Sequence, residues 1–248
     1  MTPEETRARL LYRDGLMLVL DKPAGIAVHK GPKGGASLED DFGALRFGLP
    51  RNPSLAHRLD RETAGCLVLG RHHKALEKLG LLFKQCRIAK TYWAIVEGGP
   101  EEERGLIDLP LGRLDPARGW WMKVDPDGQP SQTRWTVAGR GRFAGRPVAW
   151  LALEPLTGRT HQLRVHCAAQ GWPIVGDGVY GVSPGGGGAP GLQLLARRVV
   201  VPLSKANPPI VVEAPPPPHM HAALACCGCA DALPVARRDP AATPLAAT

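Results

Sequence analysis

Apolar residues gather in short runs along the chain, and polar or glycine-rich segments separate them. The first run, at residues 16–20, ends near a Pro-Ala-Gly turn and resumes at residues 26–29, which predicts a buried strand that is broken and continued. The apolar run at residues 66–69 predicts a short buried strand. The run at residues 88–98 predicts a central strand, because it is rich in β-branched and aromatic residues.

Helical spacing is clearest where Leu76, Leu79, Phe83 and Cys86 recur on one face, which predicts an amphipathic helix with basic flanks. Residues 38–47 predict a short helix, and residues 30–36, rich in Gly and Lys, predict a mobile loop. A further helix of about ten residues is expected near residues 160–171, because Thr160 is a suitable N-cap and Gly171 is a suitable helix end.

The middle third of the chain alternates short apolar segments with turns. Residues 105–109, 120–124, 132–137 and 147–156 predict strands of antiparallel meanders. Trp120 and Trp121 are explained most simply as packing residues, although an exposed pair could stack on unpaired bases.

Length and charge limit the possible functions. With 248 residues, of which 44% are apolar, we expect one main domain. The net charge is +8, and residues 206–248 contain two basic and three acidic residues, so the basic excess belongs to the preceding part. A basic domain suits a polyanionic partner such as RNA, although a solvated basic face is an equally good explanation of composition alone.

No apolar run is long enough to cross a bilayer, and the first five residues are polar and acidic, so we expect a cytoplasmic protein that does not interact with membranes. Cys226, Cys227 and Cys229 cluster near two histidines, but they lack the paired loops of a structural zinc site. We therefore expect neither a metal ion nor a cofactor.

The segment from His57 to Gly65, His-Arg-Leu-Asp-Arg-Glu-Thr-Ala-Gly, contains the most informative acidic residue. Asp60 lies between Arg58 and Arg61, whose charges favour its ionised form, and it could serve as a nucleophile or a base. The simpler interpretation is an aspartate that caps a turn. A protein-kinase catalytic loop is excluded, because the spacing differs and no glycine-rich loop with a following lysine comes before it. The Asp-Phe-Gly at residues 41–43 precedes this segment, whereas in a kinase it follows the catalytic loop.

Two further motifs follow. Lys90 to Val96 has the pattern Lys-x-Tyr-x-Ala-x-Val, in which Tyr92 by itself would be a core aromatic residue. Residues 158–166 read Gly-Arg-Thr-His-Gln-Leu-Arg-Val-His, and residues 173–181 read Pro-Ile-Val-Gly-Asp-Gly-Val-Tyr-Gly. Taken alone, Arg164 would be a surface cation, and the two histidines of this motif have a spacing that suits no helical metal pair.

In this order the three motifs resemble the signatures of the RluA-type pseudouridine synthases, specifically the short members without an N-terminal RNA-binding module. The resemblance covers about residues 15–220, with two small departures at Ala64 and Cys66. It implies a mixed α/β domain with a largely antiparallel bent sheet, outer helices and a central cleft. It also implies that Asp60 is catalytic, that Arg164 forms a salt bridge to it, and that Tyr92 packs against the target base.

The implied activity is the isomerisation of uridine to pseudouridine in structured rRNA or tRNA by a monomer. The uridine would be turned out of the RNA, and Arg58 would occupy the vacated place. The expected RNA-binding residues are Arg58, Arg61, Lys90, Arg159 and His161. We expect an N-terminal extension at residues 1–14, a catalytic domain at residues 15–221 and a disordered tail at residues 222–248.

Two other functions remain open. A base-excising N-glycosidase would need a second acid to activate water, and Glu62 is the local candidate. A noncatalytic RNA-binding module would need only the basic face. The sequence does not choose between a nucleophilic role for Asp60 and removal of the C2′ proton, nor does it identify the RNA.

Overall fold

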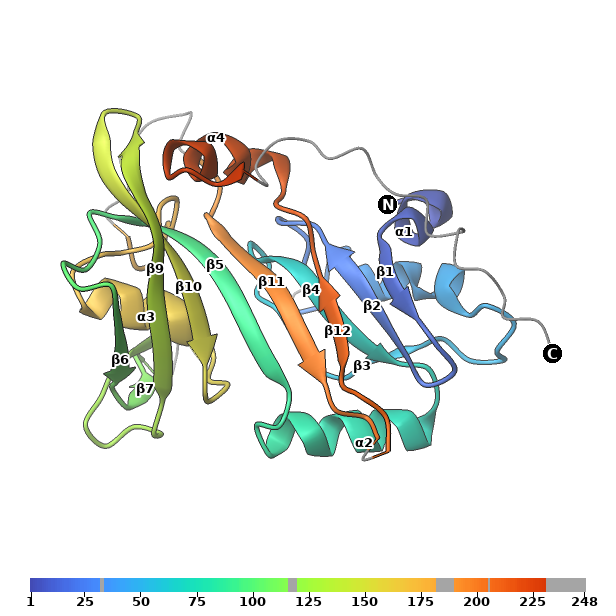
Figure 1. The fold of residues 1–248 in the computed structure, drawn as a ribbon. Coiled ribbons are helices and arrows are strands. Elements are labelled where there is room, and N and C mark those ends of the chain that lie inside the picture. Colours follow the sequence, from blue (N-terminus) through green and yellow to red (C-terminus); the bar gives the residue numbers. More distant parts are fainter. Residues whose placement is uncertain (32–33, 116–119, 182–189, 205, 231–248) are drawn as a thin grey trace.

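The computed structural model describes residues 1–31, 34–115, 120–181, 190–204 and 206–230, and a ten-stranded sheet dominates it (Figure 1). Its main path is β1 (Leu10–Arg13), β2 (Met17–Lys22), β4 (Ala64–Gly70), β11 (Leu194–Val201), β5 (Ala89–Glu97), β10 (Arg146–Pro155), β9 (Gln132–Phe143) and β6 (Arg104–Asp108). In addition, β12 (Ile210–Glu213) pairs with β11, and β3 (Ser54–Leu55) pairs with β4. A separate hairpin contains β7 (Leu111–Arg113) and β8 (Met122–Val124). The expected mixed α/β fold with a mostly antiparallel sheet is confirmed.

Helices lie around this sheet (Figure 1). They are α1 (Pro3–Ala8), the 3₁₀ helix η1 (Leu38–Leu45), α2 (His73–Lys84), α3 (Gln162–Ala169) and α4 (Pro218–Cys226). The helices expected near residues 38–47, 76–86 and 160–171 are therefore present, but Cys86 lies beyond the end of α2 and is exposed, so it does not belong to the apolar face. Within the described ranges, no helix has both the length and the apolar content needed to cross a membrane.

The strands β2 and β4 are buried on both faces, which explains their continuous apolar runs. Met17 and Val68 point to a core cluster beneath α2 and α4, whereas Leu18 and Leu67 point to a second cluster around η1. Neighbouring residues of a strand face opposite sides, so a strand between two cores must be apolar at every position.

The strands β4 and β11 form the parallel pair of the sheet, and Gly65 permits their close approach. Gly65 has φ +106°, and a Cβ at this position would collide with the carbonyl of Ala196. The glycine therefore provides both the unusual backbone conformation and the space needed beside β11. This pairing places the start of β4, and the Asp60 loop before it, near the middle of the sheet.

The disorder expected from residue 222 onward is wrong for residues 222–230, while residues 231–248 lie outside the described part of the chain. The helix α4 buries Met220, Ala223 and Leu224 against the sheet. Its carboxyl end reaches β9, where Gly139 and Gly141 leave room for backbone carbonyls of α4 and the residue after it. The glycines of β9 allow α4 to pack closely against the strand. The low content of aromatic residues in this segment had suggested disorder because it gives no sign of such packing.

Several boundaries also differ from expectation. Residues 26–29 do not continue the first strand, Trp120 and Trp121 precede β8, and β9 extends beyond residue 137 to Phe143. The boundary expected between an N-terminal extension (residues 1–14) and the catalytic domain falls inside the hairpin of β1 and β2. The strand β1 therefore belongs to the main sheet and not to a separate extension. The loop expected at residues 30–36 includes residues 32–33, which lie outside the described ranges.

We expect Gly141→Val to destabilise the protein by about 1–3 kcal/mol, because a side chain at this position displaces the end of α4. The free energy of unfolding, measured by denaturant titration, checks this expectation. Ala138→Val is the matched control, since Ala138 lies on the same strand with an exposed side chain. Equal stability of the two variants would contradict this account of how α4 packs.

Candidate active site

The loop that carries Asp60 lies between β3 and β4, and a buried lysine at the end of β2 holds its backbone. The side chain of Lys22 is 0% exposed. Its Nζ donates hydrogen bonds to the carbonyl oxygens of Pro23, Arg61 and Thr63, at 2.9, 2.9 and 2.8 Å. Burial lowers the pKa of Lys22 to about 8, although nearby carboxylates act in the opposite direction. The lysine therefore fixes the loop relative to the sheet.

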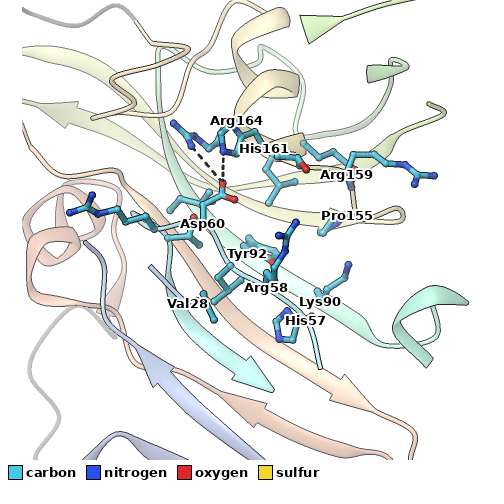
Figure 2. Close-up of a pocket in the computed structure, with 18 of the residues that line it drawn as sticks. Val28, His57, Arg58, Asp60, Lys90, Tyr92, Pro155, Arg159, His161 and Arg164 are labelled. Atoms are coloured by element: carbon cyan, nitrogen blue, oxygen red, sulfur yellow. Dashed lines mark hydrogen bonds and ion pairs between the residues drawn. The ribbon is translucent and has the colours of Figure 1, made fainter. Parts of the chain in front are cut away.

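The carboxylate of Asp60 faces α3, and one of its oxygens lies near two basic side chains (Figure 2). Asp60 Oδ2 is 3.6 Å from Nη1 of Arg164 and 3.7 Å from Nε2 of His161. Both distances are longer than those of direct hydrogen bonds. The Arg164 ion pair implied by the family resemblance is thus present as a long contact.

The guanidinium of Arg164 makes its shorter contacts with a different carboxylate, that of Asp177. Nε and Nη2 of Arg164 each donate a hydrogen bond of 2.8 Å to Asp177, and both side chains are buried. Burial raises the pKa of Asp177, but the hydrogen bonds and charge of Arg164, with two backbone N–H groups, outweigh it and lower the pKa below its ordinary value. Asp177 therefore fixes Arg164, whose remaining nitrogen reaches toward Asp60.

The turn before α3 differs from the expected cap. His161, not Thr160, is the N-cap residue; it has φ +52° and forms no side-chain cap hydrogen bond. The buried Gln162 fixes the turn before the helix, because its Oε1 accepts from the backbone N–H of Arg159 at 3.0 Å and from the Thr157 hydroxyl at 2.7 Å. The left-handed backbone aims the imidazole of His161 into the site.

A cavity of about 470 Å³ opens in front of Asp60, and Tyr92 forms part of its wall. Tyr92 comes from β5 and packs against core clusters on both sides of the site. Burial raises the pKa of Tyr92, and the charge of Asp60 adds to this effect, so the phenol keeps its proton. A volume of this order suits a small organic group such as a nucleobase.

Basic residues surround the cavity (Figure 2). The structure brings all five predicted RNA-binding residues into its lining: Arg58, Arg61, Lys90, Arg159 and His161. The three arginines are exposed, as phosphate contacts require, whereas Lys90 and His161 are partly buried. Burial lowers the pKa of Lys90. The arginines therefore form a basic rim, while the other two residues lie deeper.

Trp120 adds an aromatic surface to this rim. Its side chain is 56% exposed and lines the cavity. The ring lies edge-to-face with His161 and Trp121, at centroid distances of 5.6 and 5.5 Å. An exposed indole beside cationic residues is typical of surfaces that bind unpaired bases, so its position favours stacking over the packing interpretation.

Among the described residues that line the cavity, Asp60 is the only carboxylate. Glu62, the second acid that an N-glycosidase would require, is exposed, lies outside the lining and pairs with Arg61 at 3.6 Å. The described residues contain no group of three or more His, Cys, Asp or Glu side chains arranged to hold a metal ion. The residues present can thus supply one carboxylate, its cationic partners and an aromatic wall.

Sequence reasoning missed Lys22 and did not assign roles to Asp177 and Tyr180. A lone lysine at the end of an apolar strand was the available signal for Lys22. Asp177 and Tyr180 both lie in the quoted motif of residues 173–181, but their partners become evident only when the chain has folded.

Residues 16–169 match the family model of RNA pseudouridylate synthases. An uncharacterized RNA pseudouridine synthase of Zymomonas mobilis is 45% identical over 175 residues, covering 70% of this chain and 78% of that protein. Ribosomal large subunit pseudouridine synthase C of Vibrio cholerae is 36% identical over 177 residues, covering 69% of this chain and 52% of that protein. The match with an uncharacterized Synechocystis relative likewise spans little more than half of that protein, 55%.

Solved structures agree with these similarities. The human protein RNA pseudouridylate synthase domain containing 1 has a TM-score of 0.72 and 31% identity, over 87% of this chain and 85% of its own. Human RNA pseudouridylate synthase domain containing 4 has a TM-score of 0.73 and 25% identity, over 90% of this chain and 94% of its own. Sequence and fold thus point to the same group of proteins.

Proposed function

Because this chain belongs to the RNA pseudouridylate synthase family, we propose that it isomerises uridine to pseudouridine at specific positions of structured RNA, with Asp60 as the single catalytic carboxylate. The observation that carries this proposal is the position of Asp60. It is the sole acid among the described lining residues of a cavity that Tyr92 walls and exposed arginines surround.

The reaction explains why one carboxylate is enough. The bond between uracil N1 and ribose C1′ breaks, the uracil rotates, and a bond forms between its C5 and C1′. C5 then releases its proton and N1 gains one, so no water has to be activated. Asp60 acts either as the nucleophile at the sugar or as the base that removes the C2′ proton, and Tyr92 holds the uracil. The charge of Arg164, 3.6 Å away, stabilises the carboxylate of Asp60 for either role.

The uridine must leave the RNA helix to reach this cavity, so we propose that it binds in a flipped-out conformation. Arg58 is exposed at the cavity and, in this proposal, fills the space that the base vacates. Arg61 and Arg159 contact neighbouring phosphates, and Lys90 and His161 lie closer to the flipped nucleotide. The net charge of +8 supports such binding.

The proposed targets are rRNA or tRNA. The name of the Vibrio relative specifies the large ribosomal subunit, which supports the first of the two. We further propose that the protein acts in the cytoplasm as a monomer.

Mapping of pseudouridines in cellular RNA tests the function. A strain that lacks the gene should lose pseudouridine at defined positions, and the parent chain should restore it. Asp60→Asn expressed at the same level should not restore pseudouridine at these positions. Release of free uracil instead of pseudouridine would support the N-glycosidase, and RNA binding without either product would support the noncatalytic module.

We expect Trp120→Ala to weaken RNA binding about 5- to 160-fold, because base stacking on an aromatic side chain contributes roughly 1–3 kcal/mol. Since stacking is not ionic, the dependence of Kd on salt concentration should be unchanged. Arg159→Gln, by contrast, should lower the slope of log Kd against log salt by about 1. Titrations of the mapped RNA at several salt concentrations measure both quantities.

Leu106→Ala is the control for Trp120→Ala, because Leu106 is also exposed but does not line the cavity. Trp120→Phe should retain most of the affinity. If Trp120→Ala bound RNA as tightly as Leu106→Ala, stacking on Trp120 would be excluded.

A further inference from the structure

The two oxygens of the Asp60 carboxylate have different surroundings. Arg164 Nη1 and His161 Nε2 both approach Oδ2, at 3.6 and 3.7 Å (Figure 2). Among the described residues, these contacts of Asp60 with basic side chains involve Oδ2 and not Oδ1. Basic side chains therefore approach one oxygen of the carboxylate, which belongs to a residue that lines the cavity.

The imidazole of His161 is held in a fixed orientation. Its side chain is only 8% exposed, and the residue has a left-handed backbone that non-glycine residues seldom adopt. Its Nδ1 lies 2.7 Å from the hydroxyl of Tyr180, and the ring of Trp120 packs edge-to-face against it. Strained backbone conformations of this kind concentrate at functional sites.

The hydroxyl of Tyr180 is the hydrogen-bond partner of Nδ1 of His161, so its own hydrogen bonds bear on which ring nitrogen carries the proton. The Tyr180 oxygen accepts a hydrogen bond of 3.0 Å from the backbone N–H of Met122. Burial raises the pKa of Tyr180, so its single hydrogen is retained and can be donated to Nδ1 of His161. When Tyr180 donates in this way, the proton of the neutral imidazole lies on Nε2, toward Asp60. The opposite tautomer would direct a lone pair at the carboxylate.

We propose that His161 is a positioning residue for Asp60, and that Tyr180 sets the tautomer in which the Nε2–H group of His161 faces Oδ2. In this arrangement Arg164 and His161 restrain one oxygen, and Oδ1 is the oxygen that reacts with the nucleotide. This inference rests on the proposed catalytic role of Asp60. It gives His161 a function different from RNA binding.

Charged groups from three segments surround the imidazole. Asp60 belongs to the loop before β4, Arg164 to α3, and Asp177 to the turn that also carries Tyr180. Burial lowers the pKa of His161; Asp60 opposes this effect, Arg164 adds to it, and Asp177 opposes it. The balance favours the neutral imidazole near neutral pH, which is the form that the hydrogen bond from Tyr180 requires.

The tautomer can be measured in the free protein. NMR spectra of protein labelled with ¹⁵N-histidine distinguish the two ring nitrogens, and the loss of one set of signals in His161→Asn assigns them. We expect the Nε2–H tautomer in the parent chain and a mixture of tautomers in Tyr180→Phe. A parent imidazole protonated on Nδ1 would overturn the proposal.

A second experiment compares two replacements of His161 in single-turnover reactions with the mapped RNA. The Gln side chain places an N–H donor about as far from the backbone as Nε2, whereas that of Asn reaches only as far as Nδ1. We expect His161→Asn to slow the reaction about 10- to 100-fold, and His161→Gln to recover most of this loss. The affinity for RNA should stay near that of the parent in both variants.

The outcomes separate this inference from the proposed function. If Asp60→Asn is inactive but His161→Asn reacts at the parent rate, only the inference fails. If Asp60→Asn remains active, the proposed role of Asp60 fails first. A weaker Kd of His161→Asn with an unchanged rate would show that His161 binds RNA and does not position Asp60.

Discussion

Asp60→Asn is expected to abolish pseudouridine formation while the protein remains folded and binds RNA. Asparagine has nearly the same size, but it cannot act as a nucleophile or a base. The expected fall in the single-turnover rate is on the order of a thousandfold or more. Release of tritium from RNA labelled at uracil C5 measures the reaction, and circular dichroism checks the fold.

Glu62→Gln is the matched control, because Glu62 is a nearby but exposed carboxylate outside the cavity lining. It should react at close to the parent rate. Both variants should bind RNA with ordinary salt dependence. If Asp60→Asn turned over as fast as Glu62→Gln, the catalytic assignment of Asp60 would be wrong, and the family membership would describe only the fold.

Asp177→Asn is expected to lower the free energy of unfolding by about 3–5 kcal/mol, because the buried guanidinium of Arg164 loses the carboxylate to which it donates two hydrogen bonds, and Asp60, at 3.6 Å, is too far away to accept them. It should also slow catalysis, since Arg164 then loses its fixed position beside Asp60. Denaturant titration measures the first effect, and the single-turnover rate measures the second. Glu154→Gln provides the comparison: its ion pair with Arg134, at 3.0 Å, is exposed, and its loss should cost less than about 1 kcal/mol.

The pH dependence of stability provides an independent check on Asp177. Its pKa is lower in the folded protein than in the unfolded chain, so the folded state binds fewer protons in acid. The stabilisation is therefore complete above the ordinary carboxyl pKa and is lost as the pH falls through the lower folded-state value. Asp177→Asn should remove this part of the acid dependence. An unchanged acid profile would contradict the assignment.

Much of the fold was predictable where a short segment carries its own signal. The strand β4 is apolar at every position because it lies between two cores, and the helix α2 repeats its apolar residues at helical spacing. By contrast, β11 contains Arg197 and Arg198, which interrupt the apolar run. The structure accommodates Arg197 over the ring of Trp93 and beside Glu213, contacts that no local pattern reveals.

The site shows the same limit. The motifs identified Asp60, Tyr92 and Arg164 as neighbours because a family resemblance connected three distant segments. No pattern within one segment indicates that Lys22 reaches the carbonyl oxygens of the Asp60 loop, or that Arg164 is held mainly by Asp177. Such partners depend on tertiary contacts, and the same applies to the close packing of α4 on the glycines of β9.

The site draws its parts from distant segments: the lysine that ends β2, the loop before β4, the tyrosine of β5, and α3 with the turn after it. A working arrangement therefore requires all of these segments to be in place, and together they draw on all three clusters of the core. In a refolding experiment, enzymatic activity would return only with the last structural step. In a living cell, selection for the modified nucleotide would act on the integrity of the entire domain and would eliminate substitutions far from the cavity.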